Sequence, residues 1–195
     1  MPVLTVVIGS IRPGRAGLPI GQWFSERAHA HGGFEVRIAD LAVFDLPLMD
    51  EPHHPRLHRY QHEHTKRWAG VVESSDAFVL VTPEYNYGYP ASLKNAIDYL
   101  CVEWKDKPVG FVSYGGVAGG TRAVQQLKQV VTTLKMLPVF ESVTIPFHAG
   151  LLDSENLRLN ATDVLNQAAD AMLGELIRTE SALRSLRQVS VSDHV

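Results

Sequence analysis

The chain has 195 residues, 45% of them hydrophobic, and a formal net charge of −3. A chain of this size can close one hydrophobic core, so we expect a single domain over residues 1–195. The slight negative charge argues against a nucleic-acid partner, because it offers no basic surface to a phosphodiester backbone. No run reaches the ~20 apolar residues that a membrane span needs. The lone Cys101 excludes an internal disulfide and suits a reducing compartment, so we expect a cytoplasmic protein with no membrane partner.

The first expected strand is residues 3–8, a short and nearly all-apolar run that is typical of a strand buried on both faces. A glycine-containing loop follows at 9–17 and leads into a helix expected at 18–31. This order presents unpaired N–H groups and a positive helix end to an anion, and Ser10, Arg12 and Arg15 add a hydroxyl and two cations. The loop predicts a phosphate site, with a plain turn carrying solvated arginines as the alternative.

Two common nucleotide motifs do not match this loop. Gly9 and Gly14 have the spacing of a Walker A motif, but Arg15 and Ala16 stand where Lys and Ser or Thr would hold phosphate and magnesium. The sequence contains no GxGxxG, which disfavours a dinucleotide on the first turn. A ligand with one terminal phosphate fits the loop better.

The second strand is expected at 34–40, and the proline-rich and acidic segment 41–55 is expected as a long loop. Such a loop is an ordinary surface connection, a wall of the site or a subunit contact. A histidine group follows, with pairs spaced four apart that could face one metal on a helix, namely His53, His54, His58, His62 and His64. No cysteine or regular acidic partner completes a ligand set, so we expect a solvated helix start before a helix at 65–74 and no metal site.

An apolar strand expected at 77–82 leads into the most informative stretch of the chain, residues 82–99. Gly88 permits unusual backbone angles between two stiff prolines, and the turn offers three flat rings, those of Tyr85, Tyr87 and Tyr89. An amphipathic helix begins after Pro90. Because open parallel sheets bind ligands outside the carboxyl ends of their strands, the turn predicts contact with a planar heterocycle. A tight loop with surface tyrosines is the alternative.

A third glycine-rich loop, at 115–120, follows a strand expected at 108–114. Glycines there let a ligand ring lie against the backbone, with main-chain N–H groups as donors. The remaining expected elements are a helix at 121–136, a fifth strand at 138–145, a helix at 160–186 and a frayed tail at 188–195. The alternation of strands and helices predicts a three-layer α/β fold with a five-stranded parallel sheet. We expect the strand order 2-1-3-4-5, as in flavodoxin, in which the loops after strands 1 and 3 lie side by side.

On these residues the chain resembles the NADPH-dependent FMN reductase family, the flavodoxin-like NAD(P)H:quinone, chromate and azo reductases. The resemblance runs from residue 3 to about 145 and rests on GSIR at 9–12, PEYN at 83–86 with LKNA at 93–96, and SYGG at 113–116 with GGTRA at 119–123. It implies that the FMN phosphate is held by Ser10, Arg12, Arg15 and Gly17, with Ala16 and Leu18 beside them. It implies that the isoalloxazine ring is lined by Pro83, Glu84, Tyr85 and Asn86, and closed on its other side by Ser113, Tyr114, Gly115 and Gly116. Many members carry serine in place of Arg15 and asparagine in place of Gly17.

The resemblance implies an FMN-dependent NAD(P)H oxidoreductase that uses NADPH or NADH and reduces a quinone, flavin, azo or metal-oxyanion acceptor. It assigns no acid or base to the side chains, and Glu84 is expected to orient the backbone or to contact a neighbouring subunit. Family members are usually homodimers or homotetramers, so a homo-oligomer is expected. Two other functions remain open. One is a flavodoxin-type electron carrier, which the mild charge disfavours, and the other is a flavin-binding regulatory protein.

Overall fold

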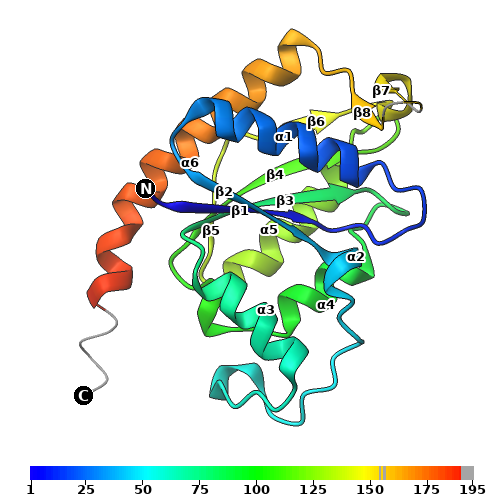
Figure 1. The fold of residues 1–195 in the computed structure, drawn as a ribbon. Coiled ribbons are helices and arrows are strands. Elements are labelled where there is room, and N and C mark those ends of the chain that lie inside the picture. The colour runs from blue at the N-terminus through cyan, green and yellow to red at the C-terminus, as the bar shows by residue number, and fades with distance from the viewer. Residues whose placement is uncertain (154, 156, 190–195) are drawn as a thin grey trace.

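A computed structural model describes residues 1–153, 155 and 157–189. Its centre is a parallel sheet in the order β2-β1-β3-β4-β5, with β6 also paired to β4 (Figure 1). The strands of this sheet are β1 Val3–Ile8, β2 Glu35–Asp40, β3 Ala77–Pro83, β4 Pro108–Tyr114, β5 Leu137–Pro138 and β6 Val143–Ile145. The predicted order 2-1-3-4-5 is confirmed.

The three central strands, β1, β3 and β4, are buried almost throughout, as their continuous apolar runs predict. Parallel pairing sets Ile8 beside Val81 and Pro83 beside Tyr114. The carboxyl ends of all three strands therefore reach the same edge of the sheet, where their following loops begin.

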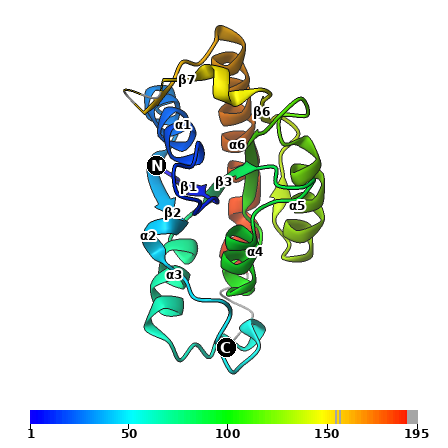
Figure 2. The same cartoon turned by 90° about the vertical axis from the view of Figure 1, so that its right-hand side faces the viewer.

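Helices cover both faces of the sheet (Figures 1 and 2). One apolar cluster joins the sheet to α1 and α6, and a second joins it to α2, α3, α4 and α5. The helices are α1 Gly17–His31, α2 Leu41–Phe44, α3 Glu63–Glu73, α4 Ala91–Asp98, α5 Thr121–Thr133 and α6 Asp163–Val189. Short 3-10 turns and a two-stranded hairpin complete the described elements, namely η1 Pro55–Leu57, η2 Val102–Trp104, η3 His148–Leu151, β7 Leu152–Asp153 and β8 Arg158–Leu159.

The fifth strand predicted at 138–145 is interrupted in the structure. Its two ends, β5 and β6, both pair with β4, and the backbone between them leaves the ladder. Glu175 of α6 accepts hydrogen bonds from the N–H groups of Phe140, at 3.1 Å, and Glu141, at 2.7 Å. A helix carboxylate thus satisfies donors that a continuous strand would have left at the open sheet edge.

Several other predicted boundaries also differ. The helix expected at 121–136 ends at Thr133, because Lys135 turns the chain with a φ of +60°. The loop expected at 41–55 begins with α2, whose amino end is capped by Asp40 through a 3.1 Å hydrogen bond from the Ala42 N–H. The tail expected at 188–195 is divided, since α6 continues to Val189 and residues 190–195 lie outside the described part of the chain.

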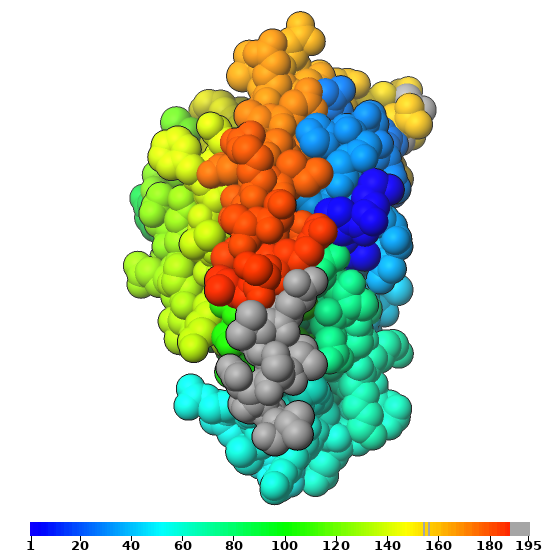
Figure 3. Space-filling view, turned by 90° about the vertical axis from the view of Figure 1, so that its left-hand side faces the viewer, coloured from blue at the N-terminus to red at the C-terminus, as the bar shows by residue number. Residues whose placement is uncertain are grey.

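The last turns of α6 are tied to the amino ends of the central strands by a buried carboxylate. Glu180, fully buried, accepts hydrogen bonds from the guanidinium groups of Arg184 and Arg187, each with a shortest distance of 2.6 Å. Arg187 also donates to Asp76 at 3.3 Å, and Asp76 accepts the Val3 N–H at 2.8 Å. Figure 3 shows α6 crossing this face of the molecule with the start of the chain beside it.

Across the described residues, none of the helices has the length and apolar character required to cross a bilayer.

Replacing Glu180 with alanine should lower the free energy of unfolding by about 2 to 3 kcal/mol, since several charge-assisted hydrogen bonds are lost at a buried position. Urea unfolding measures the change. Glu26→Ala is the matched control, because Glu26 is an exposed glutamate on α1, and it should stay within about 0.5 kcal/mol of the parent protein. Equal losses in the two variants would contradict a stabilising role for the Glu180 network.

Candidate functional site

The loop between β1 and α1 turns sharply at Pro13 and Gly14. Gly14 has a φ of +68°, and the Arg15 N–H donates to the Arg12 carbonyl at 3.1 Å. Proline followed by a left-handed glycine is the sequence pattern of a type II turn. The turn brings the chain back to the start of α1.

The amino end of α1 lacks a cap. Ala16 precedes the helix and makes no side-chain capping hydrogen bond, and the first turn carries no acidic residue. Within the described part of the chain, the N–H groups of Ser10, Ile11 and Leu18 make no hydrogen bond. Unpaired donors at the positive end of a helix are the requirement for an anion site.

The two predicted phosphate-binding arginines lie in different surroundings. Arg12 is exposed, and its guanidinium has no ion-pair partner among the described residues. Arg15 instead forms an ion pair with Asp40, at the end of β2, and both side chains are mostly buried. Arg12 is therefore the cation of this loop whose guanidinium is available to a ligand.

The second loop, after β3, is a tight hairpin. Tyr85 and Gly88 exchange hydrogen bonds at 2.8 and 2.9 Å between their N–H and carbonyl groups. The two residues between them, Asn86 and Tyr87, have φ values of +49° and +69°, as a type I′ turn requires. The unusual backbone angles were expected at Gly88, but the positive φ values occur at the two residues before it, Asn86 and Tyr87.

Glu84 fastens this hairpin to the third loop. Its carboxylate accepts the Arg122 N–H at 3.1 Å, at the amino end of α5, and forms an ion pair with the Arg122 guanidinium at 2.6 Å. That guanidinium also lies over the Tyr87 ring, 4.1 Å from its centroid. Glu84 thus orients the backbone at the start of α5, which is one of the two roles expected for it from the sequence.

The third loop approaches the sheet closely because of two glycines. Gly119 and Gly120 have φ values of +56° and +89°. A Cβ on Gly120 would lie 2.8 Å from the Ser113 Cβ, and the Ser113 hydroxyl donates to the Gly119 carbonyl at 2.8 Å. Gly116, by contrast, faces open space and leaves its N–H without a partner among the described residues.

Contacts between side chains join the three loops at one edge of the sheet, which Figure 2 faces. The hydroxyls of Ser10 and Tyr85 lie 2.8 Å apart, joining the first loop to the second. The Tyr114 side chain, from the end of β4, reaches the first residue of α1, Gly17. Its hydroxyl is buried and has no hydrogen-bond partner among the described residues.

The predicted site residues fall into three groups. The contacts above join the three loops through Ser10, Gly17, Glu84, Tyr85 and Tyr114, and Pro83, Ser113 and Gly115 are buried at the same edge. Arg12, Asn86 and Gly116 are exposed around it. Arg15 is directed to Asp40, and the side chains of Ala16 and Leu18 line a neighbouring hollow.

Sequence reasoning did not identify three residues that support these loops. Ser92 donates to the Gly9 carbonyl at 2.6 Å, and Asp40 pairs with Arg15. His148 lies 3.0 Å from the Gly115 carbonyl through its Nδ1 atom. No sequence spacing marks these contacts, because each partner comes from a different segment of the chain.

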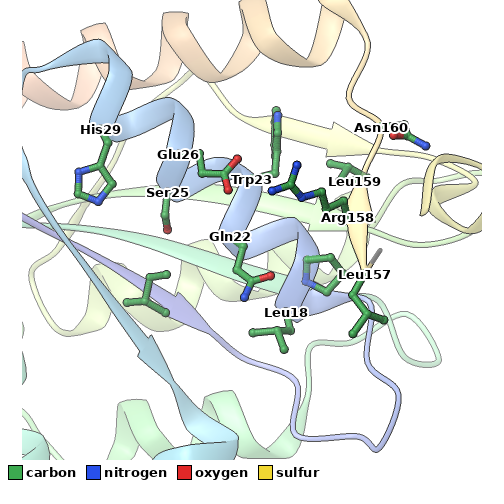
Figure 4. A pocket seen from close by; sticks show the side chains of 12 residues that line it. Leu18, Gln22, Trp23, Ser25, Glu26, His29, Leu157, Arg158, Leu159 and Asn160 are labelled. Carbon is green, nitrogen blue, oxygen red and sulfur yellow. The ribbon is translucent and has the colours of Figure 1, made fainter. Parts of the chain in front are cut away.

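A hollow of about 670 Å³ lies beside the loops, along α1 (Figure 4). Its walls come from α1 and from the segment around β8, and include Leu18, Gln22, Trp23, His29 and Arg158. A smaller hollow of about 300 Å³ shares Leu18 and extends to the first loop, between β1 and α1. These hollows flank the three-loop edge.

The histidine group makes local contacts near the start of α3. His54 accepts the Arg56 N–H at 3.1 Å, and His64 lies 3.0 Å from Asp50. The His62 and His64 rings stack with centroids 5.2 Å apart. Among the described residues no three histidine, cysteine or acidic side chains are placed to hold a metal ion.

The chain is similar to known proteins. Residues 1–150 match a family model described as NADPH-dependent FMN reductase. An NAD(P)H-dependent FMN reductase of Schizosaccharomyces pombe is 42% identical over 149 residues, which cover 74% of this chain and 74% of that protein. A quinone reductase of Pseudomonas putida is 33% identical over 139 residues, covering 68% of this chain and 71% of the relative. A solved flavoenzyme NAD(P)H:(acceptor) oxidoreductase from Paracoccus denitrificans has the same fold, with a TM-score of 0.73 at 22% identity over 93% of this chain and 98% of that chain.

Glu84→Ala should lower the free energy of unfolding by about 1 to 2 kcal/mol, because it removes both the cap of α5 and the ion pair with Arg122. Glu84→Gln keeps an acceptor for the Arg122 N–H and should lose less. Asp98→Ala is the control, since the Lys94–Asp98 pair is exposed, and should change stability by less than about 0.5 kcal/mol. Chemical denaturation of the three variants measures these differences, and a Glu84→Ala loss no larger than the control would count against the capping role.

Proposed function

This chain belongs to the NADPH-dependent FMN reductase family, and we propose that its three joined loops form the FMN site. The chain is a flavin-dependent NAD(P)H oxidoreductase that uses FMN with NADPH or NADH. The observation that carries the site proposal is the uncapped amino end of α1, which meets a buried and unpaired Tyr114 hydroxyl. Unpaired donors around a helix start fit a phosphate. We propose one FMN-binding domain over residues 1–195.

The first loop holds the phosphate in this proposal. The N–H groups around Ser10 and at the start of α1 donate to its oxygens, and Arg12 supplies the unpaired positive charge. Arg15 contributes less directly, because Asp40 already neutralises its guanidinium. Ala16, Gly17 and Leu18 take part through the backbone of the helix start.

The second and third loops hold the ring. Pro83, Glu84, Tyr85 and Asn86 form one wall, and the hairpin that carries them is fixed by Arg122. Ser113, Gly115 and Gly116 form the opposite wall, where the unpaired Gly116 N–H is available to an oxygen or nitrogen at the ring edge. Donors at that edge stabilise negative charge that develops there.

The chemistry that bound FMN would supply is the uptake of a hydride from the nicotinamide and the transfer of its electrons to an acceptor. The protein side chains position the ligands and need not transfer protons themselves, in keeping with the occupied carboxylate of Glu84. We assign the acceptor to the class of quinones, flavins, azo compounds and metal oxyanions. The quinone reductase relative favours a quinone within this class.

The surroundings of the loops support a homo-oligomer, as a dimer or a tetramer, with the site near a subunit contact. Ile11, Tyr87, Val117 and Phe147 come from or adjoin the three loops, and each exposes more than half of its surface. A gathering of exposed apolar side chains is typical of an interaction surface. Light scattering of the purified protein measures the oligomer size. Consistent with the lone Cys101, we propose a cytoplasmic location.

An anaerobic titration tests the proposed function. The purified protein should bind FMN, and NADPH or NADH alone should bleach the bound flavin; adding a quinone should then restore the colour. Protein that binds FMN but is not reduced by either nucleotide would favour the electron-carrier function. A protein that does not bind FMN would contradict the proposed site.

Arg12→Ala should weaken FMN binding by about 1.5 to 3 kcal/mol, because a charge-assisted hydrogen bond to phosphate is lost. Quenching of flavin fluorescence measures the dissociation constant. Arg59→Ala, which removes an exposed arginine far along the chain from the three loops, should leave the constant unchanged. An unaltered constant for Arg12→Ala would remove Arg12 from the site.

A further inference from the structure

The Tyr114 backbone lies at the start of the third loop, whereas its side chain reaches the end of the first loop. Its carbonyl accepts the Glu84 N–H at 3.0 Å, in register with Pro83 on β3. The side chain turns into the core shared with α1 and α6, and the residue is only 3% exposed. A Cβ placed on Gly17 would lie 2.7 Å from the Tyr114 hydroxyl. The hydroxyl therefore stands at the first residue of α1, away from the glycines that would line the ring.

This hydroxyl differs from those of two other tyrosines of the chain. Tyr99 donates to Asp50 at 2.9 Å, and Tyr60 donates to Glu103 at 2.6 Å. The Tyr114 hydroxyl is buried and has no hydrogen-bond partner within the described residues. Leaving a buried polar group unpaired is costly, so native structures rarely do it without a reason such as a ligand.

The groups around the Tyr114 hydroxyl are mostly donors. The Ser10 hydroxyl and the Gly17 N–H act on it as donors and Arg15 as a positive charge, and each of these lowers the pKa of the Tyr114 phenol. The Ser10 hydroxyl also lies 2.8 Å from the Tyr85 hydroxyl. Burial raises the pKa of the Tyr114 phenol above its ordinary value, and nearby Tyr85 adds to the rise. The phenol therefore keeps its proton at working pH and is able to donate it. The partner that this cluster lacks is an acceptor, and an anionic oxygen at a positive helix end meets that need.

We propose that the Tyr114 hydroxyl donates a hydrogen bond to the terminal phosphate of FMN and thereby selects FMN over riboflavin. The proposal rests on the proposed function, because it gives one residue of that site a specific ligand group. It moves Tyr114 from the ring wall, where the sequence resemblance placed it, to the phosphate.

The difference between a ligand-binding hydroxyl and a structural one is measurable in the apoprotein. Tyr114→Phe removes an unpaired buried hydroxyl, so the urea midpoint of the apoprotein should stay unchanged or rise. Tyr99→Phe is the matched control, because it removes a hydroxyl of a buried tyrosine that is already hydrogen-bonded. Its urea midpoint should fall.

Flavin binding tests the proposal directly. Apoprotein of the parent and of both variants is titrated with FMN and, separately, with riboflavin, and the quenching of flavin fluorescence gives each dissociation constant. Tyr114→Phe should raise the constant for FMN about tenfold, the equivalent of one hydrogen bond to a charged group, and leave the constant for riboflavin unchanged. Tyr99→Phe should leave the ratio of the two constants at the parent value.

Three results would overturn the inference. An unchanged FMN constant in Tyr114→Phe would show that the hydroxyl does not contact the phosphate. Equal weakening of FMN and riboflavin would assign Tyr114 to the ring or to general support of the loops, and in both cases the proposed function would stand. A parent protein that binds neither flavin would overturn the proposed function together with this inference.

Discussion

Parallel pairing of β1, β3 and β4 is the constraint on which the site depends. The register sets Ile8 beside Val81 and Pro83 beside Tyr114, so three loops from distant parts of the chain start at one edge. Because these strands are buried on both faces, a shift of one strand would move apolar side chains out of two cores at once. The pairing therefore also fixes the distances between the starts of the three loops. Further contacts, such as Ser92 to the Gly9 carbonyl, hold the helix starts against them.

Polar groups are satisfied to different degrees at the amino-terminal and carboxyl-terminal ends of the parallel strands. At the amino edge, buried Glu180 and its arginine partners satisfy one another and fasten α6 to the strands. At the carboxyl edge, α1 starts without a cap and the Tyr114 hydroxyl has no partner among the residues described. Unsatisfied donors reduce stability, and they persist where the surrounding structure is stable enough to hold them. A donor that no protein group occupies can bind a ligand without first breaking an internal hydrogen bond.

The hairpin after β3 shows how the protein holds an unfavourable backbone in place. Asn86 and Tyr87 both adopt positive φ, which costs more for these residues than for glycine. Arg122 opposes that cost, because it binds Glu84 and stacks on the Tyr87 ring, while Gln126 donates to the Tyr87 carbonyl at 3.1 Å. The first turns of α5 thereby determine the conformation of the loop that we assign to the flavin ring.

The sequence by itself determined the alternation of strands and helices, the three glycine-containing loops and, through family resemblance, their spatial order. These features are local or periodic, since an apolar run or a glycine at a turn acts within a few residues. Only the tertiary structure decided that Arg15 turns to Asp40, that Glu175 binds the backbone between the two halves of the fifth strand, and that the Tyr114 hydroxyl reaches Gly17. The Ser10–Tyr85 contact joins residues 75 positions apart, and no period in the sequence encodes such a pair. Side-chain direction at a strand end depends on the packing of several elements at once, and that packing exists only in the folded chain.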